Sequence, residues 1–232
     1  MRQRAWLRVV LAGCVLLGSA CARAQVQAQE VWHFDRTDSL GGHVTKVLGD
    51  PQVIETEYGK AIHFNGKDDA LFVNVHPLAG AKTWTWEMIF RPDADGAEAQ
   101  RIFDLQVQDP ATGKDIADRM LFEIRIVKGE WCLDSFATSA GQHATLLNCE
   151  DLHPFGPFYR VTAVYDGTTL RNYVGDAMQG EAKVELAPQG AGHSSVGVRI
   201  NLRDYFKGTI LEARFTKSAL AVGNCLKMPA TR

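Results

Sequence analysis

Charged and amide side chains recur at every second residue in several short stretches of this sequence. Arginine guanidinium groups bind carboxylates through two parallel hydrogen bonds, and carboxylates accept hydrogen bonds from sugar hydroxyls. If the stretches are neighbouring strands of one sheet, their polar side chains would form a single face able to bind sugar hydroxyls or uronate carboxylates. The residues that we expect to bind a ligand there are Glu123, Arg125, Asp134, Arg199 and Asn201.

The alternation of apolar and polar residues assigns these side chains to a face. Residues 121–127 are apolar at the even positions, which directs Glu123 and Arg125 away from the core, because side-chain direction flips at every residue of a strand. The stretch that ends at Asn201 is also apolar at even positions and directs Arg199 outward. Alternation does not show that the two strands are neighbours.

An alternative interpretation is a solvated outer face with ion pairs and no ligand. The same spacing places Glu87 with Arg91 and Glu212 with Arg214. Exposed ion pairs of this kind stabilise a protein by only about 0.2–1 kcal/mol each. The sequence leaves both interpretations open.

Three further residues could catalyse a reaction on an acidic sugar. A histidine and a tyrosine beside an arginine can serve as base and acid when a proton is removed next to a uronate carboxylate. The candidates are His153, Tyr159 and Tyr173, and they would make the protein a polysaccharide lyase. The alternative is that His153 lies in a loop and is bound by backbone groups.

Signatures of other chemistry do not occur in the sequence. It contains no paired-carboxylate strand of the Glu-x-Asp-x-x-Glu type, no nucleophile elbow and no phosphate-binding loop. Its seven histidines show no ligand spacing, so we expect no metal site and no cofactor. If the protein is an enzyme, a lyase is therefore favoured over a hydrolase.

The first 24 residues are typical of a secretory signal peptide. Arginines begin the segment, an apolar run extends from Val9 to Ala20, and Ala22-Arg23-Ala24 forms a small-x-small cleavage motif. We expect a secreted or periplasmic protein in which residues 25–232 form one domain. A lipid anchor at Cys21 is the alternative to cleavage and release.

Charge and hydropathy exclude two classes of partner. Without residues 1–24 the chain has 21 Lys and Arg against 27 Asp and Glu, a net charge of −6 with no basic cluster. We therefore expect no nucleic acid as a partner. After the signal peptide no apolar run is long enough to span a membrane. A polysaccharide or oligosaccharide is the partner that we expect.

Short alternating stretches separated by turn residues predict an all-β protein. Strands are expected at residues 31–34, 61–66, 70–75, 84–91, 101–107, 121–127, 131–136, 144–147, 196–201 and 209–215, with two more within 158–174. Residues 109–118 are expected to form a polar loop, and no stretch predicts a helix. Many short, regularly spaced strands indicate a sandwich or a barrel.

Asp166-Gly167 predicts a hairpin turn at the centre of the fold, since both residues tolerate positive φ. A two-residue turn would place Tyr165 opposite Thr168. A four-residue loop would place Tyr165 opposite Leu170. The sequence does not choose between these registers.

Three cysteines lie after the signal peptide, and export permits a disulfide between two of them. If a turn is centred on Ala140-Gly141, Cys132 and Cys149 are paired across the hairpin, so we expect a disulfide between them. The alternative is two reduced, buried cysteines. Cys225 is expected to be unpaired.

Three stretches of the sequence, in this order and spacing, resemble the laminin-G-like jelly roll of the concanavalin A-like lectin and glucanase superfamily. They are HFNG with DDALFV and WTWEMIFRP (residues 63–92), FYRVTAVYDG with LRNYV (158–174) and FKGTILEARF (206–215). The resemblance covers about residues 31–221. It implies two stacked antiparallel sheets and ligands that are glycans or proteins.

Some members of this superfamily are enzymes and some bind calcium. Calcium is possible here, but Ile210-Leu211-Glu212 stands where relatives often have Ile-Asp-Glu, so no specific motif supports it. The sequence therefore predicts an exported glycan-binding domain, with an acidic polysaccharide as the expected ligand. A polysaccharide lyase and a protein-adhesion or structural domain are the alternatives.

Overall fold

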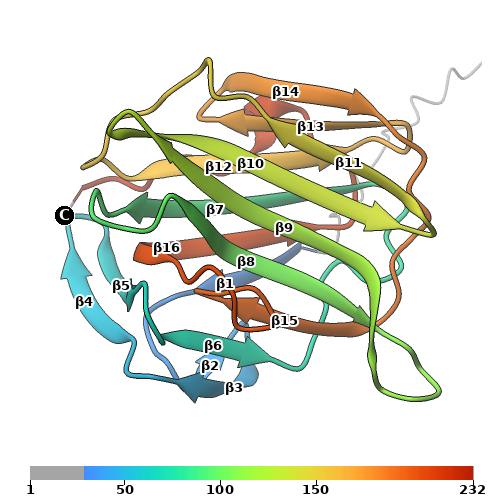
Figure 1. Cartoon of the computed structure of the whole chain (residues 1–232), viewed down its shortest axis with the longest axis horizontal. Coiled ribbons are helices and arrows are strands. Elements are labelled where there is room, and N and C mark those ends of the chain that lie inside the picture. Colours follow the sequence, from blue (N-terminus) through green and yellow to red (C-terminus); the bar gives the residue numbers. More distant parts are fainter. Residues whose placement is uncertain (1–28, 232) are drawn as a thin grey trace, which may run out of the picture.

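Two antiparallel sheets are stacked face to face in the computed structural model, which describes residues 29–231 (Figure 1). The back sheet consists, in spatial order, of β14 (Ala177–Lys183), β13 (Thr169–Val174), β12 (Tyr159–Tyr165), β7 (Trp84–Pro92), β16 (Lys207–Thr216), β5 (Gly59–Asn65) and β4 (Gln52–Thr56), with β1 (Gln29–His33) on β16. The front sheet consists of β11 (Gln142–Leu147), β10 (Glu130–Ser139), β9 (Asp115–Val127), β8 (Ala99–Gln108), β15 (Gly192–Val196), β6 (Ala70–Val73), β3 (His43–Leu48) and β2 (Ser39–Leu40). This architecture confirms the predicted two-sheet antiparallel sandwich.

The core lies between the sheets and is rich in aromatic side chains. In β7 the residues at alternate positions, Trp84, Trp86, Met88 and Phe90, all belong to it, as the sequence predicts. The ring of Trp86 lies 4.3 Å from that of Phe122 on β9 and so joins the two sheets. The inward face of each strand is thus occupied by apolar residues, which leaves the polar residues for the outer faces.

A β-bulge in β8 changes which of its residues point outward. Arg101 pairs with Glu123 whereas Phe103 pairs with Phe122, so one extra residue, Ile102, stands between them. Side-chain alternation restarts after a bulge. Arg101 and Asp104 are three residues apart and would point to opposite faces of a regular strand, yet both point outward here.

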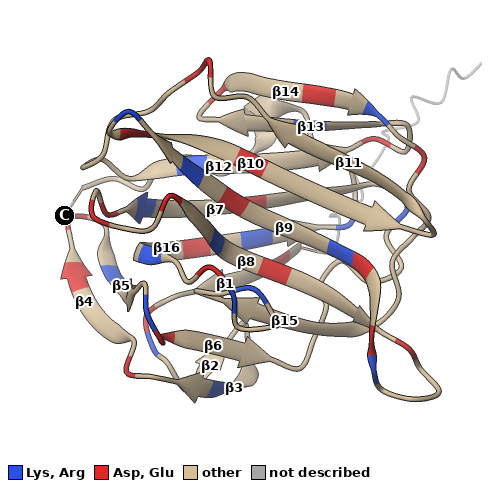
Figure 2. Ribbon diagram, viewed as in Figure 1, with Lys and Arg blue, Asp and Glu red and all other residues tan. Residues whose placement is uncertain are grey.

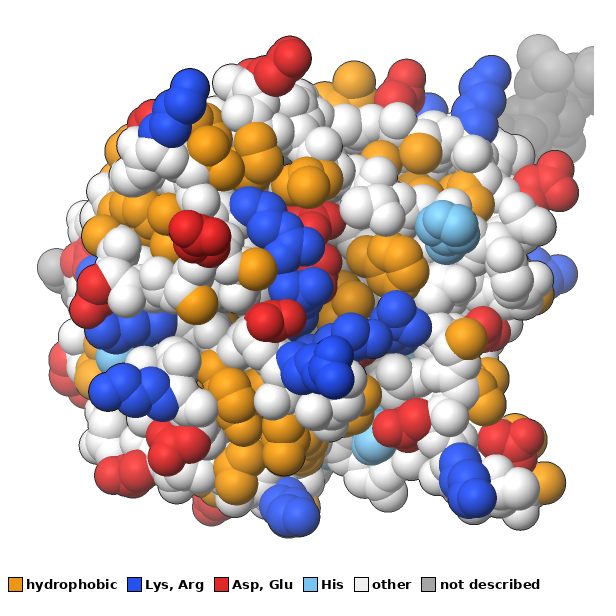
Figure 3. Space-filling view, in the orientation of Figure 1, with side chains coloured by type: hydrophobic (Ala, Val, Ile, Leu, Met, Phe, Trp, Pro, Cys, Tyr) orange, Lys and Arg blue, Asp and Glu red, His pale blue; other side chains and the backbone are white. Residues whose placement is uncertain are grey.

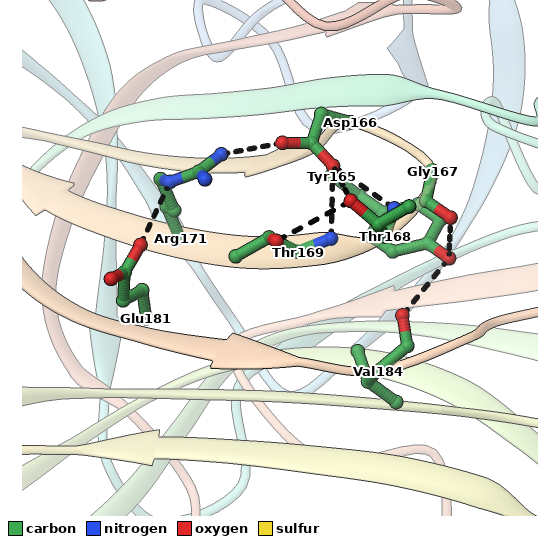
Figure 4. A network of polar contacts seen from close by, with 8 residues as sticks. All are labelled: Tyr165, Asp166, Gly167, Thr168, Thr169, Arg171, Glu181 and Val184. Atoms are coloured by element: carbon green, nitrogen blue, oxygen red, sulfur yellow. Dashed lines mark hydrogen bonds and ion pairs between the residues drawn. The ribbon is translucent and has the colours of Figure 1, made fainter.

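The β12–β13 hairpin has the longer of the two loops that the sequence allows, because Tyr165 pairs with Leu170 (Figure 4). The Asp166 carboxylate stabilises this loop by accepting hydrogen bonds of 2.9 Å from the Thr168 and Thr169 backbone N–H groups. Arg171 donates to the same carboxylate at 2.6 Å and to Glu181 on β14 at 3.1 Å.

The cysteine hairpin has the predicted register and the predicted disulfide. Residues of β10 and β11 pair about the Ala140-Gly141 turn, and a disulfide joins Cys132 to Cys149 with Cα atoms 5.2 Å apart. Cys132 lies directly opposite Arg125 of β9, which places the disulfide at the outer face of the front sheet. Cys225 is unpaired and buried.

The strand predicted at residues 196–201 is wrong in its position. β15 ends at Val196, and Gly197 adopts φ +85°, where a Cβ atom would also lie 2.4 Å from the Phe64 ring. Only glycine fits that conformation and that space, so the strand stops there. The following residues form a loop that returns along β8, where Arg101 N–H donates to the Asp204 carbonyl at 2.7 Å.

Several shorter strands were not predicted from the sequence. They are β2, β3, β4 and β14, and β9 begins at Asp115, inside the stretch expected to be a polar loop. Between residues 29 and 231 the one helical element is a 3₁₀ turn at Val222–Asn224. That part of the chain therefore has no helix that could cross a membrane. The expected signal peptide and Cys21 lie outside the described residues.

Candidate ligand-binding face

Charged residues face each other across three neighbouring strands of the front sheet. In register, Arg101 of β8 lies opposite Glu123 of β9, and Glu123 lies opposite Asp134 of β10. Arg125 follows two residues after Glu123 on the same side of β9. We call these four residues the central cluster. Figure 2 shows the resulting mixture of acidic and basic positions on β8, β9 and β10.

The guanidinium groups of the central cluster are held by carboxylates that lie beneath them. Arg101 forms ion pairs with Glu123 and, at 2.9 Å, with Asp204 of the loop after β15. Arg125 lies 2.7 Å from Asp134 and 3.7 Å from Glu123. The Glu123 and Asp134 side chains are only 5% and 1% exposed, whereas Arg101 and Arg125 are 16% and 25% exposed. Solvent and ligands therefore meet the guanidinium groups first.

The buried carboxylate of Asp134 makes ionisation of the neighbouring Glu123 less favourable. Burial raises the pKa of Glu123 to about 7; the negative charge of Asp134 raises it further, and the positive charges of Arg101 and Arg125 lower it in part. A protonated Glu123 can donate a hydrogen bond to Asp134. The central cluster thus gains a proton close to neutral pH.

A second group of charged residues lies beside the central cluster on the same face. Arg119 belongs to β9 and lies opposite Gln106 of β8, while Arg199 belongs to the loop after β15. Asp104 is fully buried, and its Oδ2 accepts a hydrogen bond of 3.1 Å from the Ile200 N–H in that loop. Burial raises the pKa of Asp104 to about 6. This bond ties the loop, and with it Arg199, to the sheet.

Basic side chains lie at the centre of this face, and hydrophobic side chains lie beside them. Figure 3 shows a band of Lys and Arg side chains across its centre, with Asp and Glu side chains partly beneath them and hydrophobic side chains beside them. Apolar neighbours within the sheet include Leu121 and Phe136, which pair in register, and the Arg119 guanidinium lies 4.9 Å from the Phe136 ring centre. We call this surface, the outer side of β8–β10 with the 199–205 loop, the front face.

The structure brings together three of the five residues expected to bind a ligand. Glu123, Arg125 and Asp134 lie within the central cluster. Arg199 approaches Asp104 and Arg119 from a loop, since the strand expected to carry it ends earlier. Asn201 is exposed in the turn of that loop.

Sequence reasoning missed three residues of the front face. In a regular strand over residues 101–107, Arg101 would point the same way as Phe103 and into the core, so only the bulge brings it outward. Asp104 lies between the inward-facing Phe103 and Leu105, so alternation alone already directs it outward. Arg119 lies between the expected polar loop at residues 109–118 and the predicted strand at residues 121–127. The alternation argument therefore gave its side chain no direction.

The three candidate catalytic residues do not form one constellation. His153 and Tyr159 are neighbours, with ring centres 5.8 Å apart, but His153 Nε2 lies 2.9 Å from Gln179 Oε1 and Tyr159 donates to the Pro154 carbonyl. Tyr173 lies opposite Thr162 and Met178 on the outer side of the back sheet. Tyr173 therefore lies apart from His153 and Tyr159, which contact Gln179 and Pro154, and a catalytic role for any of the three stays a prediction.

The second set of alternating charges lies on the outer side of the back sheet, which we call the back face. Glu87 of β7 is fully buried, with Oε2 2.6 Å from Arg214 Nε of β16 and Oε1 accepting from the Leu226 N–H at 2.5 Å. Arg160 donates to the Leu226 carbonyl at 2.6 Å. The C-terminal segment thus covers these charges. Among residues 29–231, no three His, Cys, Asp or Glu side chains are grouped to hold a metal ion.

Solved structures with this fold include carbohydrate-active proteins and toxins. Domain 4 of AbnA, an extracellular arabinanase of Geobacillus stearothermophilus in complex with arabinotriose, is 16% identical over 84% of this chain and 94% of its own, with a TM-score of 0.61. The K499G mutant of NanB sialidase from Streptococcus pneumoniae is 16% identical, with 77% of this chain matching 29% of it at a TM-score of 0.56. The binding domain of Paraclostridial Mosquitocidal Protein 1 is 9% identical, covering 84% of this chain and 50% of that one, with a TM-score of 0.57.

The chain thus spans under a third of the matched NanB chain and half of the matched toxin domain. At these identities the similarity shows the fold alone. No curated protein has a sequence that matches this one. A family model does match, over residues 65–223, which is more than half of the chain. The protein is a member of the concanavalin A-like lectin/glucanases superfamily.

Proposed function

We propose that this protein is an exported glycan-binding domain and that its front face binds an acidic polysaccharide or oligosaccharide. The observation that carries the proposal is the central cluster, in which buried carboxylates hold two partly exposed guanidinium groups on a sheet face that the chain itself leaves open. Donors held in place before binding lose little conformational entropy when a ligand arrives.

The charge of the front face favours an acidic ligand over a neutral one. The central cluster, its partner Asp204 and the group beside it contain four arginines and four carboxyl groups, which are Arg101, Arg119, Arg125, Arg199, Asp104, Glu123, Asp134 and Asp204. Arg203 of the 199–205 loop is a further, exposed arginine. Two of these carboxyl groups, Asp104 and Glu123, have pKa values raised to about 6 and about 7 by burial. Partial protonation near neutral pH leaves the face with an excess of positive charge.

The fold and the disulfide support the same proposal. The arabinanase domain of similar fold is in complex with arabinotriose, and a sandwich of this kind can present a sugar site on an outer sheet face. The Cys132–Cys149 disulfide fits an oxidising compartment outside the cytoplasm. Intact mass and N-terminal sequencing of exported protein would test cleavage near Gln25.

Binding to immobilised polysaccharides tests the proposal. The panel contains uronate polymers and neutral polymers, and each mixture is also followed for the absorbance of unsaturated products. We expect the wild type to bind uronate polymers more tightly, and Arg125→Ala to weaken that binding about tenfold, equivalent to ~1.4 kcal/mol. Arg171→Ala is the matched control, because it removes a paired arginine from the back sheet.

Three results would contradict the proposal. Wild-type protein that binds no polymer would exclude glycan binding, and equal binding of neutral and acidic polymers would exclude acidic specificity. Release of unsaturated products would show that the protein is a lyase. Equal losses in Arg125→Ala and Arg171→Ala would place binding outside the front face.

A further inference from the structure

The guanidinium group of Arg199 lacks a protein partner. Arg199 is half-buried, its Nε is enclosed, and none of its nitrogens forms a hydrogen bond or an ion pair within residues 29–231. A guanidinium carries five N–H donors, and enclosed donors in proteins are normally satisfied. A donor left enclosed without an acceptor costs about 1–3 kcal/mol. The terminal N–H groups of Arg199 are therefore available to an acceptor from a ligand.

Arg119 lies near Arg199 and also has an Nε atom that is enclosed without a partner. Its NH1 donates to the Ala117 carbonyl at 2.9 Å, and the guanidinium rests on the Phe136 ring. Burial lowers the pKa of Arg119, and the positive charge of Arg199 lowers it further. Two guanidinium groups that repel each other on a half-buried face are stabilised when an anion lies between them.

The nearest carboxyl group does not act as that anion. Asp104 is close enough for the charges of Arg119 and Arg199 to lower its pKa, but across the described residues no carboxylate oxygen is within ion-pair distance of either arginine. Its Oδ2 is bound by the Ile200 N–H, and its Oδ1 is buried without a partner. Asp104 thus positions the loop that carries Arg199 and leaves both guanidinium groups available.

We propose that Arg119 and Arg199 form a subsite for one carboxylate of the glycan, so that the ligand is a uronate-containing polymer. The inference rests on the proposed function and identifies the group that this part of the front face recognises. Two planar guanidinium groups can each direct a pair of N–H donors at the oxygens of one carboxylate. Because both Nε atoms are enclosed, the carboxylate would be bound by the terminal N–H groups of the two guanidinium groups.

Paired polymers test this subsite. Polygalacturonate, alginate and hyaluronate are each compared with their carboxyl-reduced forms, and dextran sulfate serves as a carboxylate-free polyanion. We expect Arg199→Ala and Arg119→Lys to weaken binding of the carboxylated polymers about tenfold (~1.4 kcal/mol) and to leave binding of the reduced polymers unchanged. Arg203→Ala is the matched control, since Arg203 is an exposed arginine of the same loop.

The outcomes separate the subsite from the function as a whole. Equal wild-type affinity for a polymer and its reduced form, or equal losses in Arg199→Ala and Arg203→Ala, would overturn the subsite and leave glycan binding in place. Tight binding of dextran sulfate that Arg199→Ala abolishes would assign the subsite to sulfate instead. Absence of binding to every polymer would overturn the proposed function.

A second measurement does not depend on a polymer. Arginine Nε–H resonances in ¹H–¹⁵N spectra are assigned with Arg119→Lys and Arg199→Lys, and the wild type is titrated with D-glucuronate and with D-glucose. We expect both resonances to shift with glucuronate and neither to shift with glucose, while the Arg171 resonance stays in place. Shifts that are the same for all three arginines, or no shift at all, would contradict the subsite. The spectra also report whether each variant is folded.

Discussion

The two outer faces of the sandwich carry the same pattern of alternating charges and use it differently. On the back face Glu87 forms an ion pair with Arg214, and the C-terminal segment lies over them, with Leu226 bound to Glu87. Leu226 also packs against an apolar cluster on that side. On the front face Glu123 is equally buried, but Arg101 and Arg125 above it remain partly exposed.

The difference distinguishes the structural ion pair of the back face from the binding site that we propose on the front face. On the back face the chain itself supplies the partners, since Glu87 accepts from both Arg214 and a backbone N–H. On the front face Arg119 and Arg199 form no ion pair with a carboxylate of the described chain, whereas Arg160 and Arg214 of the back sheet pair with Asp176 and Glu87. Groups that are satisfied internally stabilise the fold, whereas groups left unsatisfied on an open face are available to a ligand.

Removal of Glu87 is expected to have the largest effect on stability. Glu87→Ala leaves Arg214 and the Leu226 N–H without their acceptor, and loss of one partner of a buried pair costs about 3–5 kcal/mol. Glu123→Ala should cost less than half as much, because Arg101 keeps Asp204 and Arg125 keeps Asp134. Urea denaturation measures both. An equal or larger loss of unfolding free energy in Glu123→Ala would contradict this difference between the two faces.

Loss of the disulfide is expected to have the next largest effect. It closes a loop with a sequence separation of 17 residues beside Arg125, and Cys132→Ala with Cys149→Ala should lower the free energy of unfolding by about 3 kcal/mol. Cys225→Ala, on the side of the C-terminal segment, is the control and should cost about 1 kcal/mol or less. A larger cost for Cys225→Ala in denaturant titrations would show that the C-terminal segment, rather than the cysteine hairpin, limits stability.

The pKa of Glu123 predicts a pH dependence that belongs to the front face. Its folded value of about 7 exceeds its ordinary value of 4.5, so the folded state binds more protons between these pH values. The contribution of Glu123 to the free energy of unfolding must therefore fall as pH rises through this window, by up to ~1.4 kcal/mol per pH unit. His76, whose pKa burial lowers to about 4, acts in the opposite direction between about pH 4 and 6.5.

Comparison of Glu123→Gln with the wild type at each pH isolates this contribution, because His76 is common to both. We expect the stability of the variant relative to the wild type to increase from pH 4.5 to pH 7. Asp95→Asn is the control, since Asp95 is exposed and its pKa is lowered by Lys207, which confines its effect to more acidic pH. If the stabilities of Glu123→Gln and the wild type change with pH in parallel, the pKa of Glu123 is not raised by its burial beside Asp134.

The smallest effect is expected for an exposed ion pair on the back sheet. Arg171→Ala removes the partner of Asp166 and Glu181 and should lower the free energy of unfolding by about 1 kcal/mol or less. NMR titration should show the pKa of Asp166 rising towards its ordinary value, because Arg171 is the main group that lowers it. A loss comparable to that of Glu87→Ala would mean that exposure does not distinguish the two ion pairs.

The fold class and the direction of many side chains could be predicted from the sequence. Alternation in β7 and β9 placed Trp86 and Phe122 in the core and Glu123 and Arg125 outside it, as the structure confirms. The Ala140-Gly141 turn set the register that pairs the hairpin cysteines. These features follow from local rules, since side-chain direction and turn register depend on residues that are adjacent in the chain.

Which charged side chains remain uncovered could not be predicted, because it depends on contacts between segments that are distant in the sequence. The bulge at Ile102 brought Arg101 to the front face, and Gly197 ended β15 so that Arg199 approaches from a loop. The sequence pattern around Glu87 and Glu123 is alike, yet a segment more than 130 residues further along covers Glu87. Bulges and coverage depend on contacts between distant segments, and alternation along one strand contains no information about what packs over its outer face.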